Sequence, residues 1–467
     1  MMIESINFTW WDWIPLTGYL GLLLVIGFKT VSGYGKDDFI LSGRALTLPG
    51  FVATLVSTWY GGILGVGEFT YLYGISNWVV FGLPYYIFAF IYARFLLPKF
   101  RQENMTTIPE LFRKYTDSKT SVVSAWFVFI ISNPAPYLFM AGMMVSFLFP
   151  VPLWLGLLLV VLFSSFYLVR GGFSAVVKTD ILQFVIMFAG FALIIPFLMK
   201  TYGGIPALID SLPRHHLSFT GGNSLSFIFL WYFLALITLV DPNFYQRCMA
   251  ARDVKTAQRG IYISLLFWFI FDGMTTLTGL YAKAFMEVPV PVMTYPALAQ
   301  QILPPFLKGL FITALLATIM SSLDSFTFVS TVTLSNDILQ KWVKKNRYHR
   351  LYISSLGITL IISYLMALMF DSVIQLWYII ANIAVPPLLI PIILIFWLKK
   401  HPPAVLVSFS MIASGMISMI DLVLGQVTGK GGSFLFPALE PLYTGLILNI
   451  LIYTIYFIRL KIHVVRK

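Results

Sequence analysis

Long apolar runs separated by short polar segments make up most of the chain. A helix needs about 20 mostly apolar residues to cross a bilayer, and about thirteen segments approach or exceed that length. They are Ile14–Thr30, Leu46–Gly74, Trp78–Leu97, Val122–Leu148, Val151–Leu168, Leu182–Met199, Ser226–Val240, Ile261–Lys283, Phe306–Ile338, Leu351–Met369, Val373–Leu398, Ala404–Leu424 and Pro441–Ile458. The runs are too long for β-barrel strands, so the pattern predicts an all-α integral membrane protein with about 13 transmembrane helices.

Two helices of this pattern are interrupted by residues that disfavour a regular helix. Glycines stand at 61, 62, 65 and 67 in the span Leu46–Gly74, and the span Ser226–Val240 runs into Asp241-Pro242. Open backbone at bilayer depth is tolerated where it lines a polar site, although small residues also permit close helix packing. Breaks in two helices five spans apart fit a five-plus-five inverted repeat around a central site.

Composition and charge support a multi-pass membrane protein. Of the 467 residues, 59% are hydrophobic and 11% are charged, whereas an ordinary soluble domain has about 25% charged residues. The net charge is +12, and most of the 31 Lys and Arg residues fall in alternate connecting segments. This distribution predicts a multi-pass protein of the cytoplasmic membrane, with the N-terminus outside and the C-terminus cytoplasmic. It also accounts for the basic charge without a nucleic-acid partner.

Acidic residues inside the predicted spans carry the main chemical signal. We place five there, with no Lys or Arg at mid-span to balance them: Glu68, Asp180, Asp272, Asp324 and Asp421. An isolated charge at that depth costs several kcal/mol at least, so each acid should be protonated, hydrated or paired with a bound cation. Asp180 has a second interpretation as an early-turn acid of its helix.

A row of hydroxyl groups lies near one of these acids. Thr318, Ser321, Ser322 and Ser325 recur at i, i+3, i+4 and i+7 and so share one helix face, close to Asp324. Neutral oxygens with one or two carboxylates suit a monovalent hard cation such as Na⁺. Two alternatives remain at this point: hydroxyls bonded back to their own helix, and a proton relay.

Several segments together resemble the sodium:solute symporter family. They are Leu41–Arg44, Thr107–Lys114, Gly171–Gln183, Gln246–Arg252 and the hydroxyl face of the span Phe306–Ile338. The resemblance implies a LeuT-like fold with discontinuous helices 1 and 6. It divides the single membrane domain into an extra N-terminal helix and loop (1–45), a ten-helix transport core (46–398) and two C-terminal helices with a basic tail (399–467).

The family's common sodium site can be carried over onto this sequence. The resemblance implies that backbone carbonyls near Ser57 and Tyr60 form it together with Thr318, Ser321 and Ser322. Alanine is usual at the position of Thr318 and contributes its carbonyl, so the Thr318 hydroxyl is not required. A second sodium site of some members maps to Asp180, Ser321, Asp324 and Ser325. Those members have serine at the position of Asp324, which leaves the second ion open.

The sequence does not identify the solute. The stretch Thr58–Gly62 resembles the choline-transporter branch of the family, but it is short. We expect the solute pocket to be lined by Trp59, Glu68, Tyr137, Trp231, Tyr232, Asp272, Trp377, Tyr378 and Asn382. If the solute is cationic, Glu68, Asp272 and aromatic faces are its expected partners.

These observations predict a sodium-coupled symporter that imports a small organic solute by alternating access. The alternative is a proton-coupled transporter of the same fold, in which Asp180 or Asp324 titrates. The chain lacks a nucleophile–base set in its spans and a soluble domain large enough for catalysis, so we do not expect an enzyme. The expected partners are Na⁺, the solute and the lipid bilayer, with no obligate protein partner.

Overall fold

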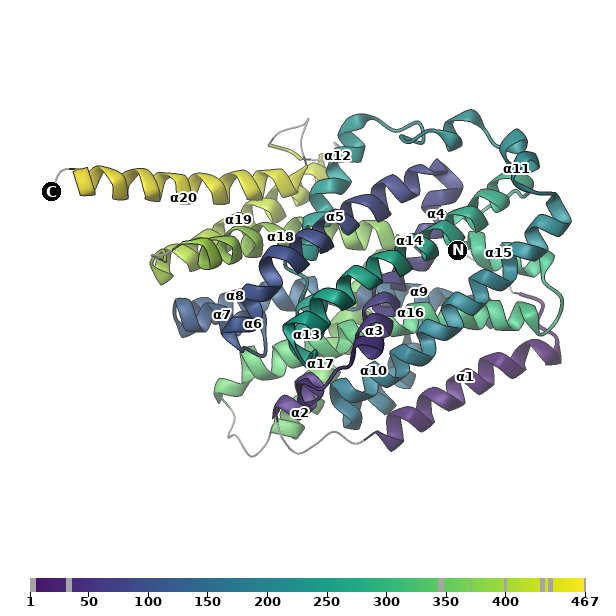
Figure 1. Cartoon of the computed structure of the whole chain (residues 1–467), viewed down its shortest axis with the longest axis horizontal. Coiled ribbons are helices and arrows are strands. Elements are labelled where there is room, and N and C mark those ends of the chain that lie inside the picture. Colours follow the sequence, from purple (N-terminus) through teal and green to yellow (C-terminus); the bar gives the residue numbers. More distant parts are fainter. Residues whose placement is uncertain are drawn as a thin grey trace.

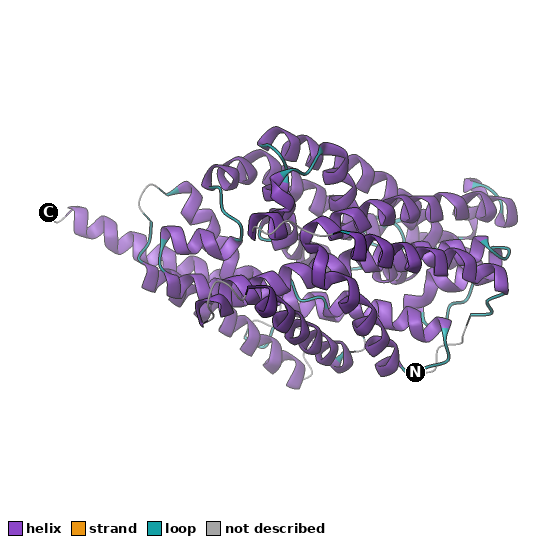
Figure 2. Cartoon of the chain, turned by 90° about the horizontal axis from the view of Figure 1, so that it is seen from below, coloured by secondary structure: helices purple, strands orange, loops and turns teal. Residues whose placement is uncertain are grey.

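The computed structural model describes residues 6–30, 36–342, 348–370, 372–398, 401–428, 433–435 and 440–465. In this part of the chain the regular structure is helical (Figure 2), and one isolated bridge pairs Leu46 with Ala251. Twelve helical segments are long and apolar enough to cross a membrane, and a shorter apolar helix covers Leu153–Val169. The all-α membrane architecture is therefore confirmed, whereas the exact count of thirteen spans is not. The end of the expected basic tail, 466–467, lies outside the described residues.

Helices that belong to the bundle are named in chain order in Figure 1. The longer ones are α1 (Trp10–Lys29), α3 (Leu48–Trp59), α4 (Ile63–Tyr73), α5 (Leu83–Ile91), α8 (Ser118–Ile131), α9 (Ala135–Leu148), α10 (Leu153–Tyr202), α12 (Leu225–Leu234), α13 (Pro242–Ala250), α14 (Val254–Phe285), α15 (Thr294–Ile302), α16 (Leu307–Val332), α17 (Tyr348–Met369), α18 (Val373–Trp397), α19 (Ala404–Val427) and α20 (Pro441–Val465). Short helices α2 (Lys36–Leu41), α7 (Ile108–Tyr115) and α11 (Ile205–Ser211) lie in the connections, and α6 (Leu97–Glu103) ends the candidate span Trp78–Glu103.

The two expected helix breaks are present. Between α3 and α4 the chain forms a tight 3₁₀ turn, η2 (Tyr60–Gly62), and between α12 and α13 it passes through a second one, η6 (Ala235–Leu239). Asp241 then caps α13, and Pro242 occupies the first turn of that helix, where its missing N–H costs nothing. The sequence therefore restarts a helix immediately after each break, which places helix ends inside the bundle.

A sharp bend in α10 joins two spans that the hydropathy pattern separates. Gly172 has φ +54° and ψ −157°, and a Cβ at this position would lie 2.7 Å from the carbonyl oxygen of Phe39. The left-handed backbone and the close approach both require glycine. This bend lies between the expected spans Val151–Leu168 and Leu182–Met199, and it sets the direction of the segment that carries Asp180.

Helix α16 lies at the centre of the arrangement. It is buried along most of its length and packs along α10, with α1, α3, α9 and α17 also in contact (Figure 1). At its start, Asp12 of α1 accepts hydrogen bonds from the backbone N–H groups of Phe306 and Gly309 and lies 3.4 Å from Lys308 Nζ. By contrast, α20 extends beyond the rest of the bundle and carries the C-terminus outward (Figure 1).

Candidate functional site

The break after α3 lies directly against the hydroxyl face of α16. A Cβ on Gly61 would lie 2.0 Å from Ser322 Oγ and 2.8 Å from a ring carbon of Tyr137, so only glycine permits this approach. The Ser322 hydroxyl donates a hydrogen bond to the carbonyl oxygen of Thr58, and the Ser321 hydroxyl donates to Ser57 Oγ at 3.0 Å. Oxygen atoms from both elements therefore converge at one point.

Each of the residues expected at the common sodium site is buried in this region. The Thr318 hydroxyl donates to the carbonyl of Ala314 at 2.7 Å, so it serves its own helix and leaves the Thr318 carbonyl as the group that could face an ion. The Tyr60 hydroxyl points away and donates to the carbonyl of Trp268 at 2.7 Å. The structure thus brings the end of α3, η2 and the Ser321–Ser322 face together.

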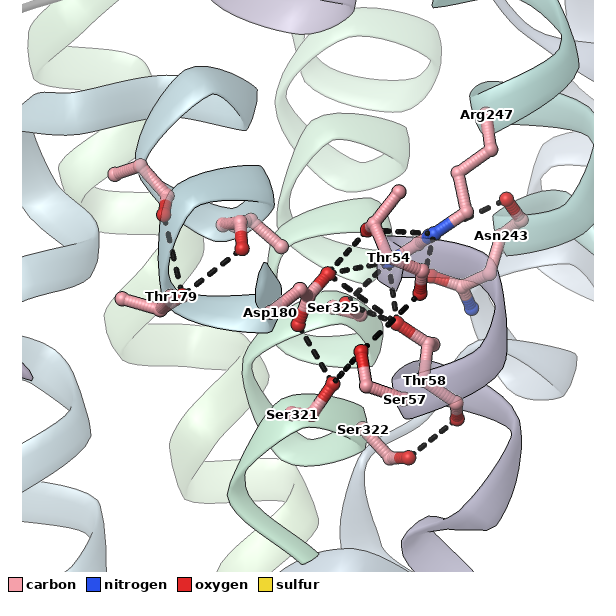
Figure 3. Close-up of polar contacts among 12 residues, drawn as sticks. Thr54, Ser57, Thr58, Thr179, Asp180, Asn243, Arg247, Ser321, Ser322 and Ser325 are labelled. Atoms are coloured by element: carbon pink, nitrogen blue, oxygen red, sulfur yellow. Dashed lines mark hydrogen bonds and ion pairs between the residues drawn. The ribbon is translucent and has the colours of Figure 1, made fainter. Parts of the chain in front are cut away.

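Asp180 joins the same cluster from α10 (Figure 3). Its Oδ1 accepts a hydrogen bond from the Ser321 hydroxyl at 2.6 Å, and its Oδ2 accepts one from the Thr54 hydroxyl. Arg247 Nη2 lies 3.1 Å from the same Oδ2, and both charged side chains are fully buried. The Asp180 carboxylate is therefore part of a buried hydrogen-bond network and does not act as an early-turn acid of its helix.

Arg247 is a residue of this cluster that the sequence analysis did not single out. Its guanidinium reaches from α13 into the cluster, where every nitrogen has an acceptor: Nε bonds to Thr54, Nη1 to the carbonyl of Asn243, and Nη2 to Thr58, Asp180 and Ser325. The expectation that no Lys or Arg balances Asp180 is therefore wrong. Hydropathy places Arg247 in a connecting segment, whereas Asp241-Pro242 starts a new buried helix that carries it back inward. The Asp-Pro pair is a helix-start signal, and it could have indicated that Arg247 lies on a buried helix.

Three of the other four expected intramembrane acids accept hydrogen bonds from neutral donors. Asp324 Oδ1 accepts from the Tyr167 hydroxyl at 2.6 Å, and Asp272 Oδ2 accepts from the Tyr86 hydroxyl. Asp421 accepts from Ser433, Thr444 and the backbone N–H of Leu435, far along the chain from the cluster. Hydroxyl and amide donors thus surround the Asp421 carboxylate, which is a way of holding a buried acid that the sequence analysis did not consider.

A cavity of about 150 Å³ adjoins the cluster. An apolar cavity of that order can hold a molecule the size of benzene. Its wall includes five of the residues expected to bind solute, namely Trp59, Tyr137, Trp231, Asp272 and Trp377. It also includes residues that the sequence did not single out for solute, among them Thr58, Tyr85, Asn133, Asp241, Asn243 and Arg247.

Four other expected solute residues lie outside this wall. Glu68 and Tyr232 belong to α4 and α12 but do not line the cavity. The Tyr378 hydroxyl donates to Glu440, whose pKa burial raises, and Asn382 Nδ2 donates to the carbonyl of Tyr378 at 2.7 Å. The neighbouring Trp377 lines the cavity instead. Adjacent residues of α18 therefore have different surroundings: Trp377 contacts the cavity, and Tyr378 contacts Glu440.

Comparison with known proteins identifies the family. The model of the sodium:solute symporter family matches residues 39–408. The chain belongs to the sodium:solute symporter family. It is 24% identical to the sodium/glucose cotransporter of Vibrio parahaemolyticus over 372 residues, which cover 70% of this chain and 68% of the relative. It is 28% identical to the osmoregulated proline transporter of Bacillus subtilis, with 71% and 72% covered, and 26% identical to the sodium/pantothenate symporter of Haemophilus influenzae, with 76% and 77% covered.

Solved structures give the same fold. A Na⁺-coupled sialic acid symporter superimposes with a TM-score of 0.76 at 16% identity, over 95% of this chain and 97% of that one. A nucleobase-cation-symport-1 family transporter gives 0.58 at 13% identity, over 88% and 92%. The LeuT-like fold, the sodium-coupled transport of a small solute and the absence of an enzymatic role are therefore confirmed for this family member. The proton-coupled alternative has no support among these relatives.

Proposed function

We propose that one sodium ion binds where the end of α3 and η2 meet α16. Its ligands would be backbone carbonyls near Ser57 and Tyr60, together with oxygens of Thr318, Ser321 and Ser322. The observation that carries this proposal is the convergence of the Ser321 and Ser322 hydroxyls on the last turn of α3, across a contact that Gly61 alone permits. Neutral oxygens beside one carboxylate suit a monovalent hard cation.

The neighbouring Asp180 cluster already contains a positive charge in this arrangement. The Arg247 guanidinium contacts Asp180 and Ser325, two of the residues of the second sodium site that the family resemblance implies. Asp324, a third member, bonds to Tyr167. We propose that Arg247 acts as a tethered cation there, so that one Na⁺ is coupled. A second Na⁺ at Asp180, Ser321, Asp324 and Ser325 is the alternative, and it requires the guanidinium to leave.

The cavity beside these two sites is proposed to hold the solute, with Trp59, Tyr137, Trp231, Asp272 and Trp377 in its wall. Because Ser322 bonds to Thr58 and Thr58 lines the cavity, an ion that orders the end of α3 also shapes the solute site. Ion and solute would then raise each other's affinity. Rocking of the interrupted helices would expose the site alternately to the two sides.

This coupling supplies enough free energy for uptake into a cell. One Na⁺ entering through a potential of 100 mV releases about 2.3 kcal/mol, and a tenfold gradient adds about 1.4 kcal/mol. Together these support a solute accumulation of about 500-fold per ion. The charge distribution of the sequence favours the cytoplasmic membrane, an outside N-terminus and a cytoplasmic C-terminus, and therefore inward transport.

Thermal stability of the purified protein in NaCl and in KCl tests the sodium site without knowledge of the solute. We expect Na⁺ to raise the melting temperature in a saturable way, because it binds the folded state only. Ser321→Ala with Ser322→Ala should require much more Na⁺ for the same shift. Ser330→Ala with Thr331→Val is the matched control, since both hydroxyls are buried on α16 without a hydrogen-bond partner among the described residues. An equal Na⁺ response in the two double variants would refute the proposed site.

A further inference from the structure

The solute cavity contains two carboxylates that make no direct ion pair with a basic side chain among the described residues. Asp241 and Asp272 both line it, and neither forms an ion pair with a Lys or Arg of the described residues. Arg247 is the basic side chain in the cavity wall, and each of its nitrogens already has a protein acceptor. The cavity wall therefore holds two carboxyl groups and one guanidinium, and only the guanidinium is fully engaged with protein acceptors.

The N-terminus of α13, which lies at this cavity, is also unsuited to binding an anion. In transporters built from broken helices, the positive N-terminus of a half-helix commonly faces an anionic group of the substrate. Here Asp241 closes that end, because its Oδ1 accepts hydrogen bonds from the backbone N–H groups of Asn243 at 2.7 Å and Phe244 at 3.3 Å. The position that would hold a solute carboxylate in α13 is thus taken by a carboxylate of the protein.

Unsatisfied polar groups in the same wall indicate that a ligand completes the site. Asn243 is 3% exposed, and its amide interacts with the Asp241 carboxylate, whereas its Oδ1 has no hydrogen-bond partner among the described residues. Trp231 Nε1, also buried, lacks a partner as well. Buried polar groups are rarely left unpaired, so both point to a solute with hydrogen-bonding capacity.

Aromatic faces supply the rest of the wall. Trp59, Tyr137 and Trp377 line the cavity, and Trp59 stacks on Trp268 with ring centroids 4.9 Å apart. Ammonium groups, quaternary ones included, bind well against such faces, above all when water is excluded. An aromatic wall with two carboxyl groups and an unpartnered amide oxygen therefore matches one class of solute better than the others.

We infer that the solute of this symporter is a small organic cation, an ammonium compound that also carries a hydrogen-bonding group. The inference rests on the proposed transport function and adds the charge of the solute. The names of the relatives cite glucose, proline and pantothenate, and the structural neighbour is a sialic acid symporter. None of those solutes carries a net positive charge, so this cavity sets the chain apart from them.

Ligand-induced thermal shift and tryptophan fluorescence of the purified protein in NaCl test the inference. Choline, which carries a permanent charge and a hydroxyl, is compared with its neutral isostere 3,3-dimethyl-1-butanol and with ethanolamine, glucose, proline and pantothenate. We expect an ammonium compound to stabilise the protein and the isostere to have little effect. Asp241→Asn should weaken binding of the ammonium compound about tenfold or more, because it removes the charge while asparagine still caps α13.

Asp210→Asn is the control, because this acid is exposed on α11 outside the cavity, and we expect it to leave binding unchanged. Stabilisation by the neutral isostere equal to that by choline would overturn the inference, and so would an unchanged affinity in Asp241→Asn. The inference would also be overturned if the protein responded normally to Na⁺ but bound only neutral or anionic solutes. The same holds if it responded normally to Na⁺ and bound no ammonium compound. Loss of the Na⁺ response itself would instead refute the proposed function, and the inference would fall with it.

Discussion

Arg247 Nη2 lies 3.1 Å from Asp180 Oδ2, and both side chains are fully buried. This ion pair joins α13, the second half of one broken helix, to α10, and both are held against the first half of the other broken helix through Thr54. The pair therefore links three elements that surround the proposed ion and solute sites. The charge of Asp180, which the hydropathy pattern shows as an isolated acid, is thus balanced by that of Arg247.

Removal of one member of this pair should be far more costly than removal of both. We expect Arg247→Met to destabilise the protein by about 3–5 kcal/mol, because Asp180 is then left as a buried charge without its partner. Addition of Asp180→Asn to Arg247→Met should recover much of that loss, since a neutral pair of similar volume leaves no bare charge. Denaturation of the purified variants, in K⁺ without Na⁺, measures both effects.

Arg252→Met provides the control for that experiment. Its guanidinium pairs with Asp253 at 3.3 Å on the exposed surface, so the change in stability should stay within about 1 kcal/mol. If the Arg247→Met protein is as stable as the Arg252→Met protein, the buried pair does not hold α13 to α10.

The contact at Gly61 should tolerate no side chain. Gly61→Ala places a Cβ 2.0 Å from Ser322 Oγ, so α16 and η2 must separate, and we expect a loss of about 1–3 kcal/mol together with weaker Na⁺ stabilisation. Gly357→Ala on α17 is the matched control, because a Cβ there meets nothing within 4 Å. The measurement is the melting temperature against Na⁺ concentration. Equal behaviour of the two alanine variants would show that the close approach is not required.

Asp324 should prove structural with respect to sodium. Its Oδ1 accepts from Tyr167, and asparagine can accept the same hydrogen bond, so Asp324→Asn should leave the Na⁺ concentration for half-maximal stabilisation essentially unchanged. Tyr167→Phe should destabilise the protein by about 1–3 kcal/mol, because it removes a donor from a buried carboxylate. A large rise in the Na⁺ requirement of Asp324→Asn would favour the second sodium site over the tethered arginine.

Much of this fold could be predicted from local patterns. Apolar run length gave the helices, and Gly61, Gly62 and Asp241-Pro242 marked the two breaks, because these residues act on backbone conformation within a few positions. The recurrence of Thr318, Ser321, Ser322 and Ser325 gave the polar face of α16 for the same reason. The family resemblance then located the partner of that face near Ser57 and Tyr60.

Contacts between distant segments could not be predicted in this way. Whether Arg247 points to water or to Asp180 depends on how α13 packs, which no window of the sequence records. Trp377 and Tyr378 are equally aromatic neighbours, yet one lines the cavity and the other bonds to Glu440. The hydropathy pattern likewise separated the two spans on either side of Gly172 but did not predict the direction of the bend, which follows from a single left-handed residue.

Equilibrium binding of radioactive sodium to the purified protein, in a K⁺ background, tests the central claim most directly. The account predicts saturable binding of about one Na⁺ per chain, which Ser321→Ala with Ser322→Ala abolishes and Ser330→Ala with Thr331→Val preserves. Two ions per chain in the protein with Arg247 intact, or no saturable sodium at all, would contradict it.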